Sequence, residues 1–129
     1  MAMIERFEDI EAWKKARELT QIVYRVTKAG EFARDFGLKD QIRRASVSAM
    51  SNVAEGFERG GNKEFIQFLS VAKGSAGEVQ SLLYVSLDAG FIRQDQFDHI
   101  YRLAQDSGRL AGGFMKYLKQ SGYRGGKFA

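Results

Sequence analysis

The stretch that decides the fold is QIRRASVSAMSNVAEGFERGGNKEFIQFLSVAKGSAGEVQSLLYV, residues 41–85. Gly60 and Gly61 divide it into two halves that both show helical spacing. The first half, extended back to residue 38, carries two apolar rows: Leu38, Ile42, Ala45, Ala49 and Val53, and beside them Val47, Met50, Ala54 and Phe57. The second half carries one long row in steps of four and three: Phe65, Leu69, Ala72, Ala76, Val79 and Leu83. We therefore predict two long helices joined by a glycine corner.

The apolar surface of these two helices exceeds what a single subunit needs, because a helix in a monomeric bundle buries one stripe. We therefore predict a homo-oligomer. Its candidate subunit interface is formed by Val47, Met50, Ala54, Phe57, Phe68 and Val71. A polar row separates the two apolar rows of the first half, and we predict that it joins the second half in a network between helices or between subunits. The candidate members are Asn52, Glu55, Ser75 and Glu78.

Two further helices are predicted outside this stretch. One begins after Asp9 as its N-cap and ends near Gly30, and the last begins near residues 93–95. The stretch itself supplies helices over about 39–59 and from Asn62, the predicted N-cap, to a stop at Gly90. Short connections favour an all-α, antiparallel up-and-down four-helix bundle over residues 1–120, followed by a flexible basic tail over 121–129.

The sequence also predicts the surroundings of two phenylalanines in a connection and of the glycines inside the helices. Residues 31–39 form a charged connection whose Phe32 and Phe36 are predicted to tuck under the bundle. Gly74 and Gly77 interrupt an apolar row that continues past them, which favours close approach of a neighbouring backbone. For the glycines of the last helix, close helix contact and a bend both remain open; these are Gly108, Gly112 and Gly113.

The positive charge of the chain is concentrated at its C-terminal end. Residues 1–108 contain 15 Lys and Arg against 16 Asp and Glu, whereas residues 109–129 contain 5 Lys and Arg and no acid. Such a segment suits contact with phosphates, although a solvated helix end with a tail explains it equally well. The candidate nucleic-acid-binding residues are Arg43, Arg44, Arg59, Arg109, Lys116, Lys119, Arg124 and Lys127.

The residue inventory gives no indication of an enzyme. The chain has no cysteine and a single histidine, His99, so cysteine nucleophiles are excluded and no metal or cofactor site is predicted. Gly60-Gly61-Asn62-Lys63 lacks the spacing of a phosphate-binding loop. No apolar run is long enough to span a membrane, and the start of the chain does not resemble a secretory signal. A cytoplasmic location is the expectation.

Several motifs in order resemble one known family. They are SNVAEG at 51–56, KEF at 63–65, AKGSAGE at 72–78 and the opening FEDIEAWKKAREL at 7–19. The chain is similar to the bacterial four-helix bundle protein family, also called 23S rRNA intervening-sequence proteins, over about residues 5–120. The resemblance implies a bundle that assembles as a ring-shaped homopentamer. Where that family has a proline before the Ser-Asn pair this chain has Met50, so a kink in the second helix is in question.

Two hypotheses on function follow. A protein related to this family, the accessory factor of diversity-generating retroelements, associates with nucleic acid and a reverse transcriptase, which implies RNA or DNA as a partner. The first hypothesis is therefore a non-enzymatic, oligomeric, nucleic-acid-associated accessory protein. The alternative is a structural module that organises a protein partner and has no role with nucleic acid. It is favoured by the surplus apolar faces, which self-assembly also explains.

Overall fold

The computed structural model describes residues 4–121, which form four α-helices and two short 3-10 helices with no strand in that range. The helices are α1 (Glu11–Thr27), α2 (Phe36–Glu58), α3 (Asn62–Asp88) and α4 (Gln94–Ser121), with 3-10 helices at Phe7–Asp9 and Gly30–Arg34. The all-α helical bundle predicted from the apolar spacing is confirmed. The α2 helix runs without interruption past Met50.

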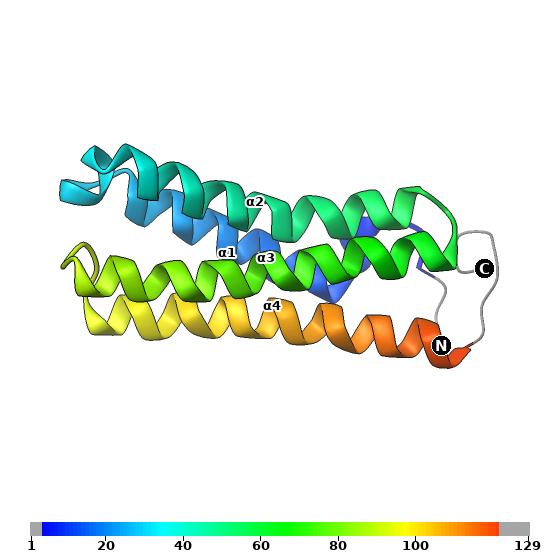
Figure 1. Ribbon diagram of the computed structural model, residues 1–129. Coiled ribbons are helices and arrows are strands. Elements are labelled where there is room, and N and C mark those ends of the chain that lie inside the picture. Colours follow the sequence, from blue (N-terminus) through cyan, green and yellow to red (C-terminus); the bar gives the residue numbers. More distant parts are fainter. Residues whose placement is uncertain (1–3, 122–129) are drawn as a thin grey trace.

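Figure 1 shows the four helices side by side, with the connections between consecutive helices at alternating ends of the bundle. The chain therefore returns along the bundle at each connection. Each helix packs chiefly against the helices next to it in the sequence, and α1 also packs against α4. The side chain of Asn62 at the start of α3 donates a hydrogen bond to the Leu118 carbonyl near the end of α4, at 3.2 Å.

The interior consists of two large apolar clusters separated by a thin layer of small residues. At the end of the bundle that contains Gly30 and Gly90, the cluster includes Leu19, Val23, Phe32, Ile42, Leu83 and Ile100. At the end with the Gly60 corner, it includes Ile10, Val53, Phe57, Phe65, Leu69 and Leu118. Between them lie Ala16, Ala49 and Ala76, with Met50 against them. Small side chains allow the helices to come close at mid-bundle, and close packing holds their register there.

Two predicted N-caps are wrong. Asp9 belongs to the 3-10 helix before α1, whose turn is closed by the Ile10 amide on the Phe7 carbonyl at 3.0 Å, and no side chain caps α1. Asn62 is the first residue of α3 and turns its amide toward α4 instead of the backbone of its own helix. In both places a tertiary or local backbone contact replaces the side-chain cap that the sequence suggested.

The α2 helix begins earlier than predicted because Asp35 caps it. The Asp35 carboxylate accepts a hydrogen bond from the Leu38 amide at 3.0 Å, and α2 starts at Phe36. Phe32 is buried as predicted, and its ring lies 5.2 Å from that of Phe91. The prediction for Phe36 is wrong, since it is 73% exposed and has the Lys39 ammonium 5.0 Å from its ring centroid.

The glycines differ sharply in what surrounds them. A Cβ on Gly74 or Gly77 would meet nothing within 4 Å, so the predicted close approach does not occur within this chain. On Gly108 a Cβ would lie 3.5 Å from the Cβ of Ala76, which settles the open question there in favour of close helix contact. The helix stop at Gly90 is confirmed, with a positive φ of 78° that suits glycine.

Candidate functional site

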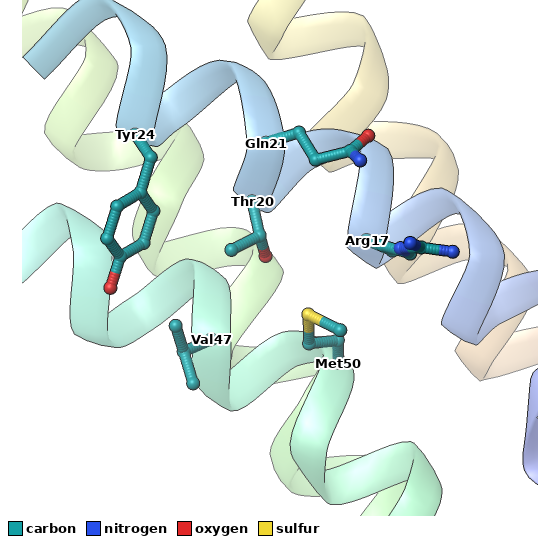
Figure 2. Close-up of a pocket in the computed structure, with 6 residues that line it drawn as sticks. All are labelled: Arg17, Thr20, Gln21, Tyr24, Val47 and Met50. Carbon is teal, nitrogen blue, oxygen red and sulfur yellow. The ribbon is translucent and has the colours of Figure 1, made fainter.

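A shallow, open groove of about 370 Å³ lies between α1 and α2 (Figure 2). Its lining is mostly apolar and comes from Arg17, Thr20, Gln21, Tyr24, Val47 and Met50. The Thr20 hydroxyl joins the two helices at the groove, because it lies 2.8 Å from the Ala16 carbonyl and 3.0 Å from the Ser46 carbonyl. Tyr24 and Val47 remain 41% and 39% exposed. An exposed apolar groove of this kind suits a protein contact.

The predicted interface residues divide into three groups. Val71 is 51% exposed on α3, and Val47 lines the groove on α2. Half-buried positions are taken by Met50, Ala54 and Phe68. The prediction for Phe57 is wrong, because it is 1% exposed and packs in the core with its ring centroid 6.3 Å from that of Phe65. The second apolar row of α2 therefore turns from the surface into the interior as it approaches the corner.

Gly56 explains why α3 comes close enough to enclose Phe57. A Cβ at Gly56 would stand 2.7 Å from the Cβ of Phe68 and 2.8 Å from the ring of Phe65. Those separations are shorter than van der Waals contact, so only glycine fits between the helices at this point. The bare backbone of α2 thus lets two phenylalanines of α3 pack directly on it.

The predicted polar network is only partly formed. Ser48 and Ser75 share a hydrogen bond of 2.7 Å between α2 and α3, and the Asn52 amide donates to the Ser48 hydroxyl at 2.9 Å. Glu55 and Glu78 do not join them. Glu55 pairs with Arg59 at 2.7 Å, and Glu78 accepts a hydrogen bond from Gln41 at 3.2 Å. Ser48 is thus the centre of the network, because it is the α2 residue that touches Ser75.

The three candidate arginines of α2 do not form one basic surface. Arg43 places its guanidinium 4.4 Å from the Tyr24 ring centroid and donates to the Thr27 hydroxyl at 2.8 Å, while Arg44 pairs with Asp40 at 2.8 Å. Arg59, at the other end of α2, lies 5.1 Å from the Phe68 ring centroid, and its hydrogen bond with Glu55 raises its pKa. Each of these side chains already has partners within the chain.

The candidate residues of α4 are less engaged. Arg109 pairs with Asp106 at 2.7 Å. Lys116 and Lys119 are exposed in the last turns of α4, and neither has an ion-pair or hydrogen-bond partner within residues 4–121. Arg124 and Lys127 lie outside the described residues, as does the predicted tail over 121–129 except for Ser121. Ser121 is the last residue of α4, so the helix extends one residue into the predicted tail. The free positive charge of the described chain in this region is therefore at the end of α4.

A second surface, which the sequence reasoning missed, lies along the contact of α3 with α4. Tyr84 is 51% exposed, and its ring centroid is 4.9 Å from that of Phe97 and 5.9 Å from that of Tyr101. The nearby Tyr101 raises the pKa of Tyr84, chiefly because two phenolate charges would repel each other. The signal that was available is a row of non-aliphatic residues on α3 in steps of four, three and four: Lys73, Gly77, Gln80 and Tyr84.

Within residues 4–121, no three or more acidic, histidine or cysteine side chains come together as metal ligands do. His99 is exposed on α4. None of the described helices combines the length and the hydropathy that a membrane-crossing segment requires.

The family model of the 23S rRNA-intervening sequence proteins matches residues 8–113, a range that contains α1, α2 and α3 whole and the first 20 of the 28 residues of α4. The chain belongs to this family. The resemblance found in the sequence motifs is thereby confirmed. No curated protein matches the chain.

Among solved structures, the chain is similar to a Bacteroides thetaiotaomicron protein that is described as of unknown function and from the S23 ribosomal protein family. The TM-score is 0.75 at 20% identity, and the match covers 81% of this chain and 95% of the other. At that identity the likeness establishes a shared fold. Neither this structure nor the family description assigns an activity to the site residues.

Proposed function

We propose that this member of the 23S rRNA-intervening sequence protein family is a non-enzymatic accessory protein that assembles as a ring-like homopentamer and associates with nucleic acid through phosphates. The observation that carries the nucleic-acid part is the pair of exposed lysines Lys116 and Lys119, which have no ion-pair or hydrogen-bond partner within residues 4–121 and lie in a segment after residue 108 that contains no acid. A cytoplasmic location belongs to the proposal and is supported by the cysteine-free sequence.

Assembly is supported by two apolar surfaces that differ in shape. The α1–α2 groove is hollowed, whereas Val71 and Val85 on α3 are 51% and 50% exposed. In an up-and-down antiparallel bundle, to which the alternating connections correspond, these surfaces face different directions. A groove on one copy that receives the α3 valines of the next copy makes a head-to-tail contact, and such contacts close into rings when the rotation fits.

A ring multiplies each weak phosphate contact. The two lysines of one copy supply little affinity by themselves, but repetition raises avidity by about 10² to 10⁴ without a base-reading motif. Contacts of this type release counterions, so binding falls steeply as salt increases. The α2 arginines contribute less to such binding, because Asp40 and Glu55 offset the charges of Arg44 and Arg59, and Arg43 is engaged by the Tyr24 ring and the Thr27 hydroxyl.

The test of this proposal combines light scattering with binding of labelled mixed-sequence RNA and DNA at several salt concentrations. The double variant Lys116→Gln with Lys119→Gln is expected to lower affinity and to flatten the salt dependence. The matched control is Lys28→Gln, which removes one exposed lysine near the opposite end of the bundle. A single-chain mass, or the absence of binding at low salt, would overturn the corresponding part of the proposal.

The alternative, a module that organises a protein partner, is favoured by the same exposed valines Val71 and Val85 if they stay uncovered in the assembly. It predicts a protein that co-purifies reproducibly after nuclease treatment. A Val71→Glu variant would then lose that protein and keep the mass of the assembly. Recovery of nucleic acid alone would count against this alternative.

A further inference from the structure

Two matching rows of side chains run along the contact of α3 with α4. The α3 row is Lys73, Gly77, Gln80 and Tyr84, and the α4 row is Tyr101, Gln105, Gly108 and Gly112. Both follow steps of four, three and four residues, which keeps each row on one side of its helix. We call these eight residues the α3–α4 seam.

The contacts across the seam fix how the two rows face each other. Tyr84 meets Tyr101 with ring centroids 5.9 Å apart. Further along, a Cβ on Gly108 would lie 3.8 Å from the Lys73 carbonyl, and one on Gly112 would lie 3.6 Å from the Cδ of Lys73. The rows therefore run in opposite directions. One end of the seam is aromatic, and the other end is a lysine laid over glycine backbone.

The aromatic end is open to solvent and has no cation over it. Tyr84 is 51% exposed, and within residues 4–121 no Lys or Arg side chain lies over its ring. The Tyr84 ring packs at a tilt of 60° against Phe97, with 4.9 Å between centroids, and edge-on against Tyr101. Such a ring offers a flat face on which a nucleobase can stack.

The other end of the seam carries uncompensated positive charge. Lys73 is exposed and has no ion-pair or hydrogen-bond partner within the described residues, and the seam contains no acid. Lys119 follows Gly112 by seven residues, which places it on the same side of α4 two turns further on. Glu78 and Asp106 lie on the same helices but off the two rows, and they contact Gln41 and Arg109. The acids that continue the rows, Asp88 and Asp98, lie one turn beyond the tyrosines at the opposite end.

We propose that the α3–α4 seam, together with Lys119 beyond its end, binds single-stranded nucleic acid, with bases stacked on Tyr84 and Tyr101 and phosphates held by Lys73 and Lys119. A single strand fits because its bases are free to stack on a side chain, whereas the bases of a duplex already stack on each other. The acids beyond the tyrosines repel phosphates, so the backbone runs from the aromatic end toward the lysines. This inference rests on the proposed function and names its substrate class.

The seam is long enough for several nucleotides. From Tyr101 to Lys119 the α4 backbone rises by about 27 Å, at about 1.5 Å per residue. The glycines at its centre keep side chains out of the path, since Gly77 and Gly108 have none. Gln80 and Gln105 lie between the glycines and the tyrosines and carry amides that can hydrogen-bond base edges.

The test is fluorescence anisotropy of the full-length protein with labelled oligonucleotides of about 12 nucleotides, a length within the usual range of single-strand sites. The probes are mixed-sequence RNA and DNA, the corresponding duplex, and an abasic strand with the same phosphates. Single strands are expected to bind more tightly than the duplex and the abasic strand. Tyr84→Leu should weaken single-strand binding roughly 10- to 100-fold, whereas Tyr84→Phe should keep it, because only the ring is needed.

Matched controls separate the seam from general effects. Tyr117→Leu removes a tyrosine that is 43% exposed and packed edge-on against Phe114 in the same helix as Tyr101, and it should leave affinity unchanged. Lys73→Gln should lower the slope of log affinity against log salt by about 0.7, the value for one phosphate contact on a single strand. Lys28→Gln should not change the slope.

The outcomes distinguish the two proposals. If no probe binds at low salt, both the proposed function and the seam are overturned. If strands bind but Tyr84→Leu and the abasic strand bind like their references, the seam alone is overturned and phosphate binding stands. If Tyr84→Leu lowers the mass in light scattering, a second copy covers the seam and the inference is wrong. Should Tyr84→Leu fail to fold, the wild-type comparison of the abasic and normal strands still decides.

Discussion

Two exposed tyrosines, one at the contact of α1 with α2 and one at the contact of α3 with α4, have different surroundings. Tyr24, between α1 and α2, is 41% exposed, and Arg43 from its own chain places a guanidinium 4.4 Å from its ring centroid. Tyr84, between α3 and α4, is 51% exposed and rests on Phe97 and Tyr101, with no cation over it among the described residues. The ring of Tyr24 is therefore part of a contact within the chain, whereas the ring of Tyr84 is open to solvent.

The comparison shows that exposure alone does not tell how a surface residue is used. The chain itself supplies a partner for Tyr24, and the neighbouring groove is apolar, which suits packing against another copy. Residues 4–121 supply no such cation for Tyr84, and the row beyond it is polar and basic. The side chains that a neighbouring helix places near an exposed tyrosine thus decide which kind of partner the surface suits, another protein or a charged polymer.

The largest expected effect is loss of self-association in Val47→Glu. A carboxylate in the mostly apolar α1–α2 groove would lose its hydration in the assembly, and disrupting a central interface position weakens association roughly 30-fold or more. Light scattering at several protein concentrations measures it. Tyr84→Glu, on the other seam, should keep the wild-type mass. If Tyr84→Glu lowered the mass and Val47→Glu did not, the subunit interface would lie at the α3–α4 seam and not at the α1–α2 groove.

The next effect contrasts two glycines of opposite surroundings. Gly56→Ala should lower the free energy of unfolding by about 1–3 kcal/mol, because a Cβ there overlaps Phe65 and Phe68. Gly77→Ala should raise it by about 0.5–1 kcal/mol, because the site is open and alanine favours the helix. Urea unfolding at one fixed protein concentration compares them. Equal effects would mean that α2 and α3 are not in close contact at Gly56.

A smaller effect is expected when the cation over Tyr24 is removed. Arg43→Gln loses the contact with the ring and the hydrogen bond to Thr27, so stability should fall by about 1–2 kcal/mol. Arg44→Gln is the matched control, since its exposed pair with Asp40 contributes less than about 1 kcal/mol. Thermal unfolding measures both. If Arg43→Gln leaves the stability unchanged, the contact of the Arg43 guanidinium with the Tyr24 ring has no energetic role, and Tyr24 and Tyr84 no longer differ in this respect.

The smallest effect concerns the start of α4, beyond the tyrosines of the α3–α4 seam. The hydrogen bond from Arg93 lowers the pKa of Asp95, so the folded protein binds this proton less readily than the unfolded chain. The stabilisation is therefore present above the ordinary aspartate value of 3.8 and is lost as pH falls through the lowered folded-state value. Asp95→Asn should lower the melting temperature slightly at neutral pH, and the difference should vanish in acid. A pH-independent difference would contradict this origin.

Much of the fold was predictable because helical spacing is a local property. The steps of three and four residues located the helices, and the stop at Gly90 followed from the conformational freedom of glycine. The predicted start of α2 is too late, because the Asp35 cap lies among the charged residues of the predicted connection. Asn62 was misread for the opposite reason, since its partner, the Leu118 carbonyl, is far away in the sequence.

The candidate site was less predictable because it depends on which helices meet. Two rows of α2 looked equally apolar, yet Phe57 is in the core and Val47 is on the surface. The polar row looked continuous, yet Glu55 turns to Arg59 while Asn52 reaches Ser48. The first difference is decided by contacts with α3, which enclose Phe57. In the second, both bonds lie within α2, and Ser48 alone joins the row to Ser75 of α3.

The sequence by itself determined that this chain forms four amphipathic helices, that it belongs to the 23S rRNA-intervening sequence proteins, and that its acids end before residue 109. Those properties depend only on the order of residues along the chain. Only the tertiary structure decided that Arg43 covers Tyr24, that Tyr84 stays open beside Tyr101, and that Lys73 lies over Gly112. Each of these contacts joins two helices, and their relative rotation is set by packing across the whole bundle.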